Sequence, residues 1–190
     1  MHWAAARKDF EIVRALLDAG GDVQGSGDVH ELGVIGWAAV YREPGDDPSA
    51  VVSLLLERGA RHHIFSAISL GDPALIRKLI EEHPDALRQR MSRFEDGQTP
   101  LHFAIQRKRY DILDLLIELG ADLEAEDHHG HTALAVAMMR GDQRAIGRLH
   151  AAGAKGNKGW SVASVPREPA DSPGFAPALG KVARSIQKGV

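Results

Sequence analysis

Thr99-Pro100-Leu101-His102 is the stretch that decides the fold of this chain, together with Ala104 and Gly120 further along. The pattern returns 33 residues later as Thr132-Ala133-Leu134-Ala135, with Ala137 and Gly153 at the same offsets. A repeat of this length is typical of a unit that contains two short helices and a turn. Such units bury a core only by stacking on one another, which leaves one long face open for binding.

An alanine in the first helix of each unit gives the register of the whole array, and it falls at Ala4, Ala38, Ala67, Ala104 and Ala137. An apolar cluster opens nine residues later in four of the units, and five extra residues within 43–48 delay it in the second. The third unit ends its second helix at His83-Pro84, because the residue before proline disfavours helix. These marks give units at about 1–33, 34–61, 62–97, 98–130 and 131–154.

The residue types at the ends of the helices agree with this division. Threonine before proline predicts a helix start, because its hydroxyl accepts an unpaired backbone N–H and proline is pre-set for the first turn. Glycine after the second helix, as at Gly120, predicts a left-handed cap. Asp127-His128-His129-Gly130 predicts a tight turn at the tip of a loop. Each unit is therefore expected to fold as helix, turn, helix and finger-like loop.

These motifs resemble those of the ankyrin-repeat family over residues 1–154, most strongly in 98–153 and clearly in 2–22. The resemblance implies an all-α solenoid of about five helix-turn-helix units with hairpin-like finger loops. It also implies that His2 and His102 form structural hydrogen bonds to a nearby finger backbone. The second and third units depart from the family pattern, since both lack Thr-Pro-Leu-His and the segment Gly25–Ile35 is longer than a normal finger.

The overall composition argues against several classes of protein. Hydrophobic residues make up 44% of the 190, which is enough for a core, and the formal net charge of −3 does not favour nucleic acid as a partner. The chain has no cysteine, which excludes disulfides, zinc fingers and cysteine nucleophiles. No apolar run approaches the length of a membrane span. We therefore expect a cytoplasmic protein that binds neither nucleic acid nor membrane.

Histidines invite a metal hypothesis that the spacing does not support. His128, His129 and His131 lie beside acidic residues, and His62-His63 form a second pair. Adjacent imidazoles point apart and rarely chelate one ion. We interpret both groups as exposed finger residues that are available for contacts. Since no hydrolase elbow or phosphate-binding loop occurs either, no catalysis, metal or cofactor is predicted.

The partner-binding face is expected along the first helices and the finger tips. Arginine stands three residues after the anchor alanine in three of the five units, which predicts a groove with a basic stripe. A guanidinium group binds a carboxylate through two parallel hydrogen bonds and stacks on aromatic rings. Alternatively, these arginines only keep a helix surface hydrated. The candidate partner-binding residues are Arg7, Tyr41, Arg42, Leu70, Arg93, Phe94, Gln106, Arg107, His128, His129, Met139 and Arg140.

Both ends of the array look unfinished. Trp3, Ile12 and Leu16 are of core type although no unit precedes them, so we expect either a truncated array or a covering partner. A monomer is expected, with a dimer through the first unit as the alternative. Residues 155–177 are rich in Gly, Ser and Pro and predict a linker, and 178–190 predict a short basic amphipathic helix or the start of a further domain.

The function predicted from these features is that of a protein–protein interaction module with no catalysis of its own. The alternative is a regulatory or targeting arm of a larger enzyme whose catalytic domain lies beyond the C-terminus. Some bacterial proteins that resemble this chain carry such an array ahead of a glyoxalase-like domain, so a bacterial origin and a glyoxalase-like neighbour are expected in that case.

Overall fold

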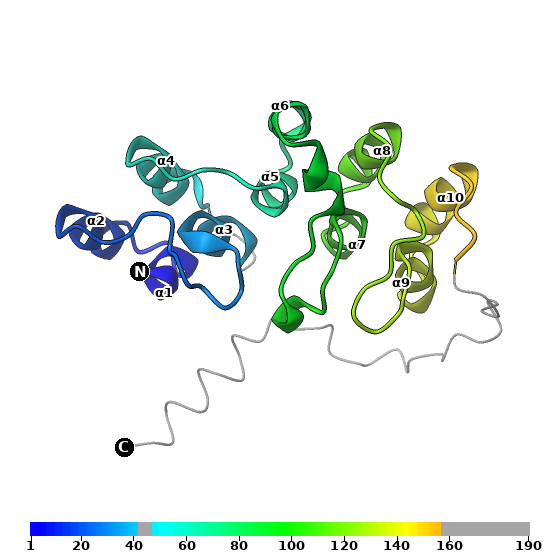
Figure 1. Cartoon of the computed structure of the whole chain (residues 1–190), viewed down its shortest axis with the longest axis horizontal. Coiled ribbons are helices and arrows are strands. Elements are labelled where there is room, and N and C mark those ends of the chain that lie inside the picture. Colours follow the sequence, from blue (N-terminus) through cyan, green and yellow to red (C-terminus); the bar gives the residue numbers. More distant parts are fainter. Residues whose placement is uncertain (42–46, 157–190) are drawn as a thin grey trace, which may run out of the picture.

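The computed structural model describes residues 1–41 and 47–156, which form five consecutive pairs of antiparallel helices. Figure 1 shows the first helices of the pairs as an inner row and the second helices as an outer row that arches over it. The inner helices are α1 (His2–Ala6), α3 (Gly33–Val40), α5 (Ile64–Leu70), α7 (Pro100–Gln106) and α9 (Ala133–Met139). The outer helices are α2 (Phe10–Asp18), α4 (Ser49–Glu57), α6 (Pro73–Glu82), α8 (Tyr110–Glu118) and α10 (Gln143–Ala151).

The turn between the two helices of a pair uses the same local chemistry in most repeats. Its first residue adopts a left-handed backbone, and an aspartate then caps the outer helix. The carboxylates of Asp9, Asp72 and Asp142 accept the backbone N–H three residues later, at 3.1, 3.0 and 3.1 Å. The left-handed residues are Lys8, Gly71, Lys108 and Gly141.

The core runs through the whole stack, both between the two helices of each pair and between neighbouring repeats. The anchor alanines Ala38, Ala67, Ala104 and Ala137 are fully buried, because small side chains let the inner helices approach closely. Large aliphatic side chains of the outer helices fill the remaining space. The first repeat differs, since Ala4 is only partly buried.

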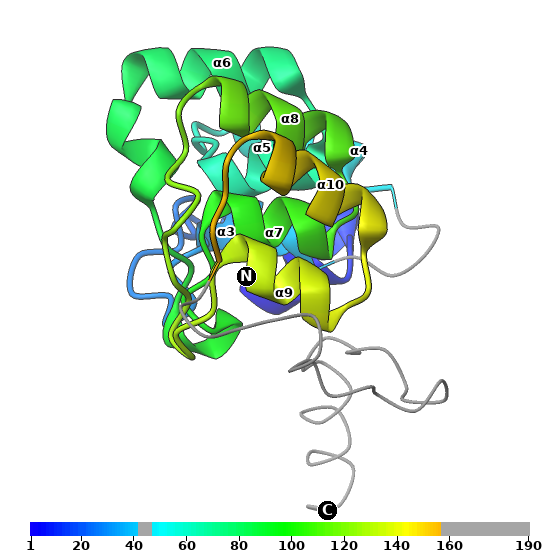
Figure 2. The same ribbon diagram turned by 90° about the vertical axis from the view of Figure 1, so that its right-hand side faces the viewer.

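Loops at one end of the inner helices form the fingers, which lie together in Figure 2. We number them in chain order: finger 1 spans 19–32, finger 2 spans 58–63, finger 3 spans 83–99 and finger 4 spans 119–132. Finger 4 is hairpin-like as predicted, with an antiparallel bridge between Glu126 and Thr132 and Gly130 at φ 76°. Finger 3 contains two short 3₁₀ helices, η1 (Pro84–Arg88) and η2 (Arg93–Glu95).

The stack is irregular between the second and third repeats. Finger 2 is too short to form a hairpin, and the widest gap of the outer row in Figure 1 separates α4 from α6. A pocket of about 480 Å³ opens beside this boundary, with His62, His63, Leu79, His83 and Arg88 among its lining residues. As predicted, α6 ends immediately before His83-Pro84.

Some predictions fall on parts of the chain outside the described residues. These are Arg42, most of the insertion at 43–48, the linker beyond residue 156 and the basic helix at 178–190. Within 1–41 and 47–156, no helix combines the length and the apolar character that a membrane span requires.

Candidate interaction surface

The fourth repeat holds its finger in place with a buried imidazole. His102 Nε2 donates a hydrogen bond to the carbonyl of His131 in finger 4, at 2.9 Å. Burial lowers the pKa of His102, so the ring is neutral and its Nδ1 accepts from the hydroxyl and the backbone N–H of Thr99, at 2.7 and 3.3 Å. The predicted structural bond of His102 is confirmed. The corresponding bond of His2 is not formed, because within the described part of the chain its buried Nε2 has no hydrogen-bond partner.

The third repeat uses the same two groups in exchanged positions. His63 stands at the helix start and Ser66 three residues later, and the Nδ1 of His63 accepts from the backbone N–H of Ser66 at 3.3 Å. Its Nε2 donates to the carbonyl of Leu32 at 2.9 Å, in finger 1. Burial lowers the pKa of His63 to about 4. The interpretation of His63 as an exposed contact residue is therefore wrong, because the ring is a buried bridge from the third repeat to finger 1.

The short finger 2 lets the fingers on either side of it meet. One oxygen of Glu95 in finger 3 accepts from His30 Nδ1 in finger 1 and from the hydroxyl of Tyr41. Its other oxygen accepts from the hydroxyl of Ser92 at 2.6 Å. Burial, reinforced by the hydrogen bond to Glu95, raises the pKa of Tyr41, so this phenol keeps its proton. We call this group (His30, Tyr41, Ser92 and Glu95) the finger clasp.

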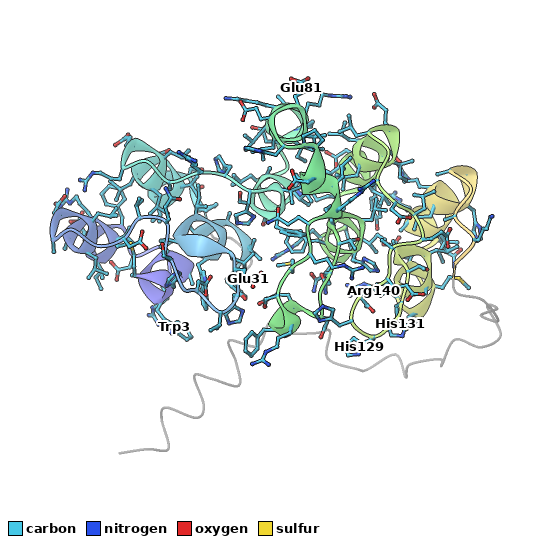
Figure 3. All side chains as sticks on the ribbon, viewed as in Figure 1. Trp3, Glu31, Glu81, His129, His131 and Arg140 are labelled. Carbon is cyan, nitrogen blue, oxygen red and sulfur yellow. The ribbon has the colours of Figure 1, made fainter. Side chains whose placement is uncertain are left out.

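Aromatic rings continue from the clasp toward the first repeat. The ring centroids of Trp3 and Trp37 lie 6.2 Å apart, those of Trp37 and Tyr41 4.7 Å, those of Trp37 and His30 5.0 Å, and those of His30 and Phe94 4.9 Å. We call these five residues the aromatic row. Its middle is packed, whereas its two ends are open, with Trp3 45% and Phe94 51% exposed. Figure 3 shows Trp3 at the finger side of α1.

The predicted basic stripe is interrupted at its centre. Arg7 and Arg140 are exposed, but the guanidinium of Arg107 donates to the carbonyl of Val40 at the end of α3 and lies 4.9 Å above the ring of Phe103. Arg107 therefore connects the fourth repeat to the second. In finger 3, the guanidinium of Arg93 lies 5.0 Å from the ring centroid of Phe94 and leaves both side chains exposed.

The histidines of finger 4 contact finger 3. The backbone N–H of His128 donates to the carbonyl of Asp96 at 2.8 Å, and His129 Nε2 lies 3.2 Å from the Asp96 carboxylate. Both imidazoles remain exposed, and Figure 3 shows His129 at the tip of finger 4. Among the described residues, no three His, Cys, Asp or Glu side chains form a group that could hold a metal ion.

The remaining predicted contact residues lie near the ends of the inner helices. Leu70, Gln106 and Met139 are each partly buried. The predicted contact residues do not include His30 and Val29, although Val29 is 64% exposed beside the aromatic row. The contrast between the long finger 1 and the short finger 2 is visible in the sequence and could have pointed to them.

A stack of helix pairs with finger loops defines an ankyrin-repeat protein, and comparison with known proteins agrees. The family model described as "Ankyrin repeats (3 copies)" matches residues 63–158. This chain therefore belongs to the ankyrin-repeat family.

Similar proteins share the repeats over less than half of the chain. Mouse inversin is 36% identical over 81 residues, which cover 43% of this chain and 7% of inversin. The serine/threonine-protein kinase VIK of Arabidopsis thaliana is 38% identical over 83 residues, covering 44% of this chain and 18% of the kinase. The chicken nuclear factor NF-kappa-B p105 subunit is 30% identical over 77 residues, covering 40% of this chain and 8% of that protein. The match thus spans less than a fifth of each relative.

Proposed function

We propose that this chain is a protein-recognition module that holds a segment of a partner protein against the finger side of the array. The observation that carries the proposal is the aromatic row, whose ends Trp3 and Phe94 are 45% and 51% exposed. Large aromatic side chains are enriched at the energetic centres of protein interfaces. Arg93, stacked beside Phe94, adds a guanidinium that can pair with a carboxylate of the partner.

The support beneath these anchors strengthens the proposal. The ring of Phe94 rests on His30, and its neighbour Glu95 is fixed by the finger clasp. An anchor that is already ordered loses little conformational entropy on binding, so more of its contact energy contributes to affinity. The exposed Arg140, at the C-terminal end of α9, is a further candidate contact.

Affinity capture with matched variants tests this function. Partners retained by the wild-type chain should be lost with Phe94→Ala combined with Arg93→Glu, and retained with Leu56→Ala, which removes an apolar side chain that is 40% exposed on α4. A partner identified in this way is then titrated as a purified protein, and the double variant should weaken its affinity by about 100-fold, the effect of losing one anchor. Equal binding of both variants contradicts the proposal.

A second candidate is that the module serves as the recognition arm of a larger protein. The observation that favours it is the length of the relatives, of which the matching segment covers 7% to 18%, and one of which is named as a kinase. This candidate includes the case in which the larger protein is an enzyme, for example one with a glyoxalase-like catalytic domain. Sequencing the coding region on both sides of these 190 codons tests it, since stop codons on both sides contradict it and an open frame into a foldable domain supports it.

A further inference from the structure

Helix α2 has two apolar faces, and only one of them is inside the protein. Val13 and Leu17 point into the core and are 0% and 8% exposed. Ile12 and Leu16 are 51% and 37% exposed, and the exposed alanines Ala15 and Ala19 complete a stripe with them. The spacing 12, 15, 16, 19 is that of one continuous helix face. We call this stripe of four residues the end face.

The same positions are buried in the second, fourth and fifth repeats, and in the third, beside the irregular boundary, Leu75 and Leu79 are partly buried. The residues that correspond to Ile12 in the second, fourth and fifth repeats are Val51, Ile112 and Ala145, which are at most 1% exposed. Those that correspond to Leu16 are Leu55, Leu116 and Leu149, all 0% exposed. The end face therefore has the chemistry of the surface through which repeats stack on one another, and it continues that established interface outward.

The opposite end of the stack does not offer a matching surface. Among the described residues, no large apolar side chain of α9 or α10 is exposed to a similar degree, and α10 presents Gln143, Arg144 and His150 to solvent. Head-to-tail stacking of two molecules would consequently place the apolar end face against a polar one. The surface of this molecule that matches the end face in chemistry is the end face of a second copy.

We propose that two copies of this chain associate through their end faces, with α2 of one copy packed against α2 of the other about a two-fold axis. Such an interface is self-complementary and closes at two molecules. The small side chains of Ala15 and Ala19 let the two helices approach, while Ile12 and Leu16 lose their contact with water. The association needs neither Phe94 nor Arg93, so it is independent of the partner binding proposed above.

Sedimentation of the full 190-residue chain across a range of concentrations tests the dimer. The wild type is expected to reach twice its monomer mass of 20.6 kDa, and Leu16→Glu is expected to remain at the monomer mass. Leu56→Glu is the matched control, since Leu56 is also an exposed leucine on an outer helix (40% against 37%) but lies outside the end face. Circular dichroism confirms that each variant keeps its helices.

A second experiment avoids any damage to the fold. The chain contains no cysteine, so a single Ala15→Cys provides a unique thiol on the end face, and Ala152→Cys provides one at the other end of the stack. Mild oxidation should produce a disulfide-linked dimer with Ala15→Cys at least tenfold faster than with Ala152→Cys. A monomer at every concentration, equal cross-linking at the two ends, or a helical Leu16→Glu variant that still dimerises would each overturn the proposal.

Discussion

The starts of the third and fourth inner helices, α5 and α7, are both stabilised by an imidazole and a hydroxyl, which occur in opposite order in the sequence. In the fourth repeat, Thr99 begins the helix and the imidazole of His102 reaches forward to finger 4. In the third, the imidazole of His63 begins the helix and reaches back to Leu32 in finger 1, with Ser66 supplying the hydroxyl. The comparison teaches that in these two repeats a neutral imidazole joins a helix start to a finger, and that either order of residues supplies it.

The largest effect is expected where the third repeat makes room for its imidazole. A Cβ atom on Gly36 would lie 2.6 Å from His63 Nε2 and 2.7 Å from Leu32 Cβ, both of which are held in place. Gly36→Ala should lower the free energy of unfolding by about 3 kcal/mol through overpacking and loss of the bridge. Chemical denaturation measures the free energy of unfolding of this variant and of the wild type. Gly147→Ala in α10 is the control, because nothing lies within 4 Å and the free energy should rise by about 0.5 kcal/mol.

The pH dependence of stability separates the two imidazoles from ordinary surface histidines. The pKa of His63 is lowered from 6.5 to about 4, so the unfolded chain binds the proton more readily and acid favours unfolding. This contribution is complete above pH 6.5 and is lost as the pH falls toward 4, by about 2 kcal/mol between pH 6.5 and 5. His102 acts in the same direction.

Denaturation midpoints of His63→Gln measured across this range should show a shallower slope than those of the wild type. The exposed His150→Gln variant in α10 should keep the wild-type slope. An unchanged slope in His63→Gln would show that the ring is not the source of the acid sensitivity.

Removal of the hydroxyls tests whether the two helix starts are equivalent. Thr99→Ala deletes the hydroxyl partner of the His102 imidazole, and Ser66→Ala deletes the hydroxyl that bonds the backbone of His63. Each should cost about 1 kcal/mol of unfolding free energy. Thr99→Ser and Ser66→Thr, which retain the hydroxyl, should recover most of it. A cost confined to one repeat would break the analogy between them.

The smallest effect is expected at the finger clasp, which exists only beside the irregular boundary. Glu95→Gln keeps an oxygen that accepts from Tyr41 but removes the charge, at a cost of about 0.5 kcal/mol. Hydrogen exchange at the backbone of residues 92–97 should accelerate more than exchange in finger 4. Asp85→Asn, an exposed carboxylate of η1, is the control and should leave exchange in 92–97 unchanged.

The sequence predicts most of the fold because the repeat positions act locally. Thr132 caps α9 at 3.3 Å through the backbone N–H of Ala135, and Pro84 ends α6, as the residue types indicate. The candidate site is predicted less well, because its contacts join distant residues. Glu95 meets His30 from 65 residues away, and Arg107 turns onto the carbonyl of Val40, which only the stacking geometry decides. The aromatic character of Phe94 and Tyr41 is visible in the sequence, but the contacts that His30 and Glu95 make around them are not.

The boundary between the second and third repeats has the mechanics of a hinge. Contacts of the fingers and of the inner row cross it, since His30 meets Glu95 and Arg107 reaches Val40. The outer helices α4 and α6, in contrast, stand apart at the same boundary in Figure 1. A boundary that is held by contacts along its inner side and is open along its outer side bends about the inner side. Curvature of the array can therefore change by varying the distance between α4 and α6, while the aromatic row stays together as the fixed axis of that motion.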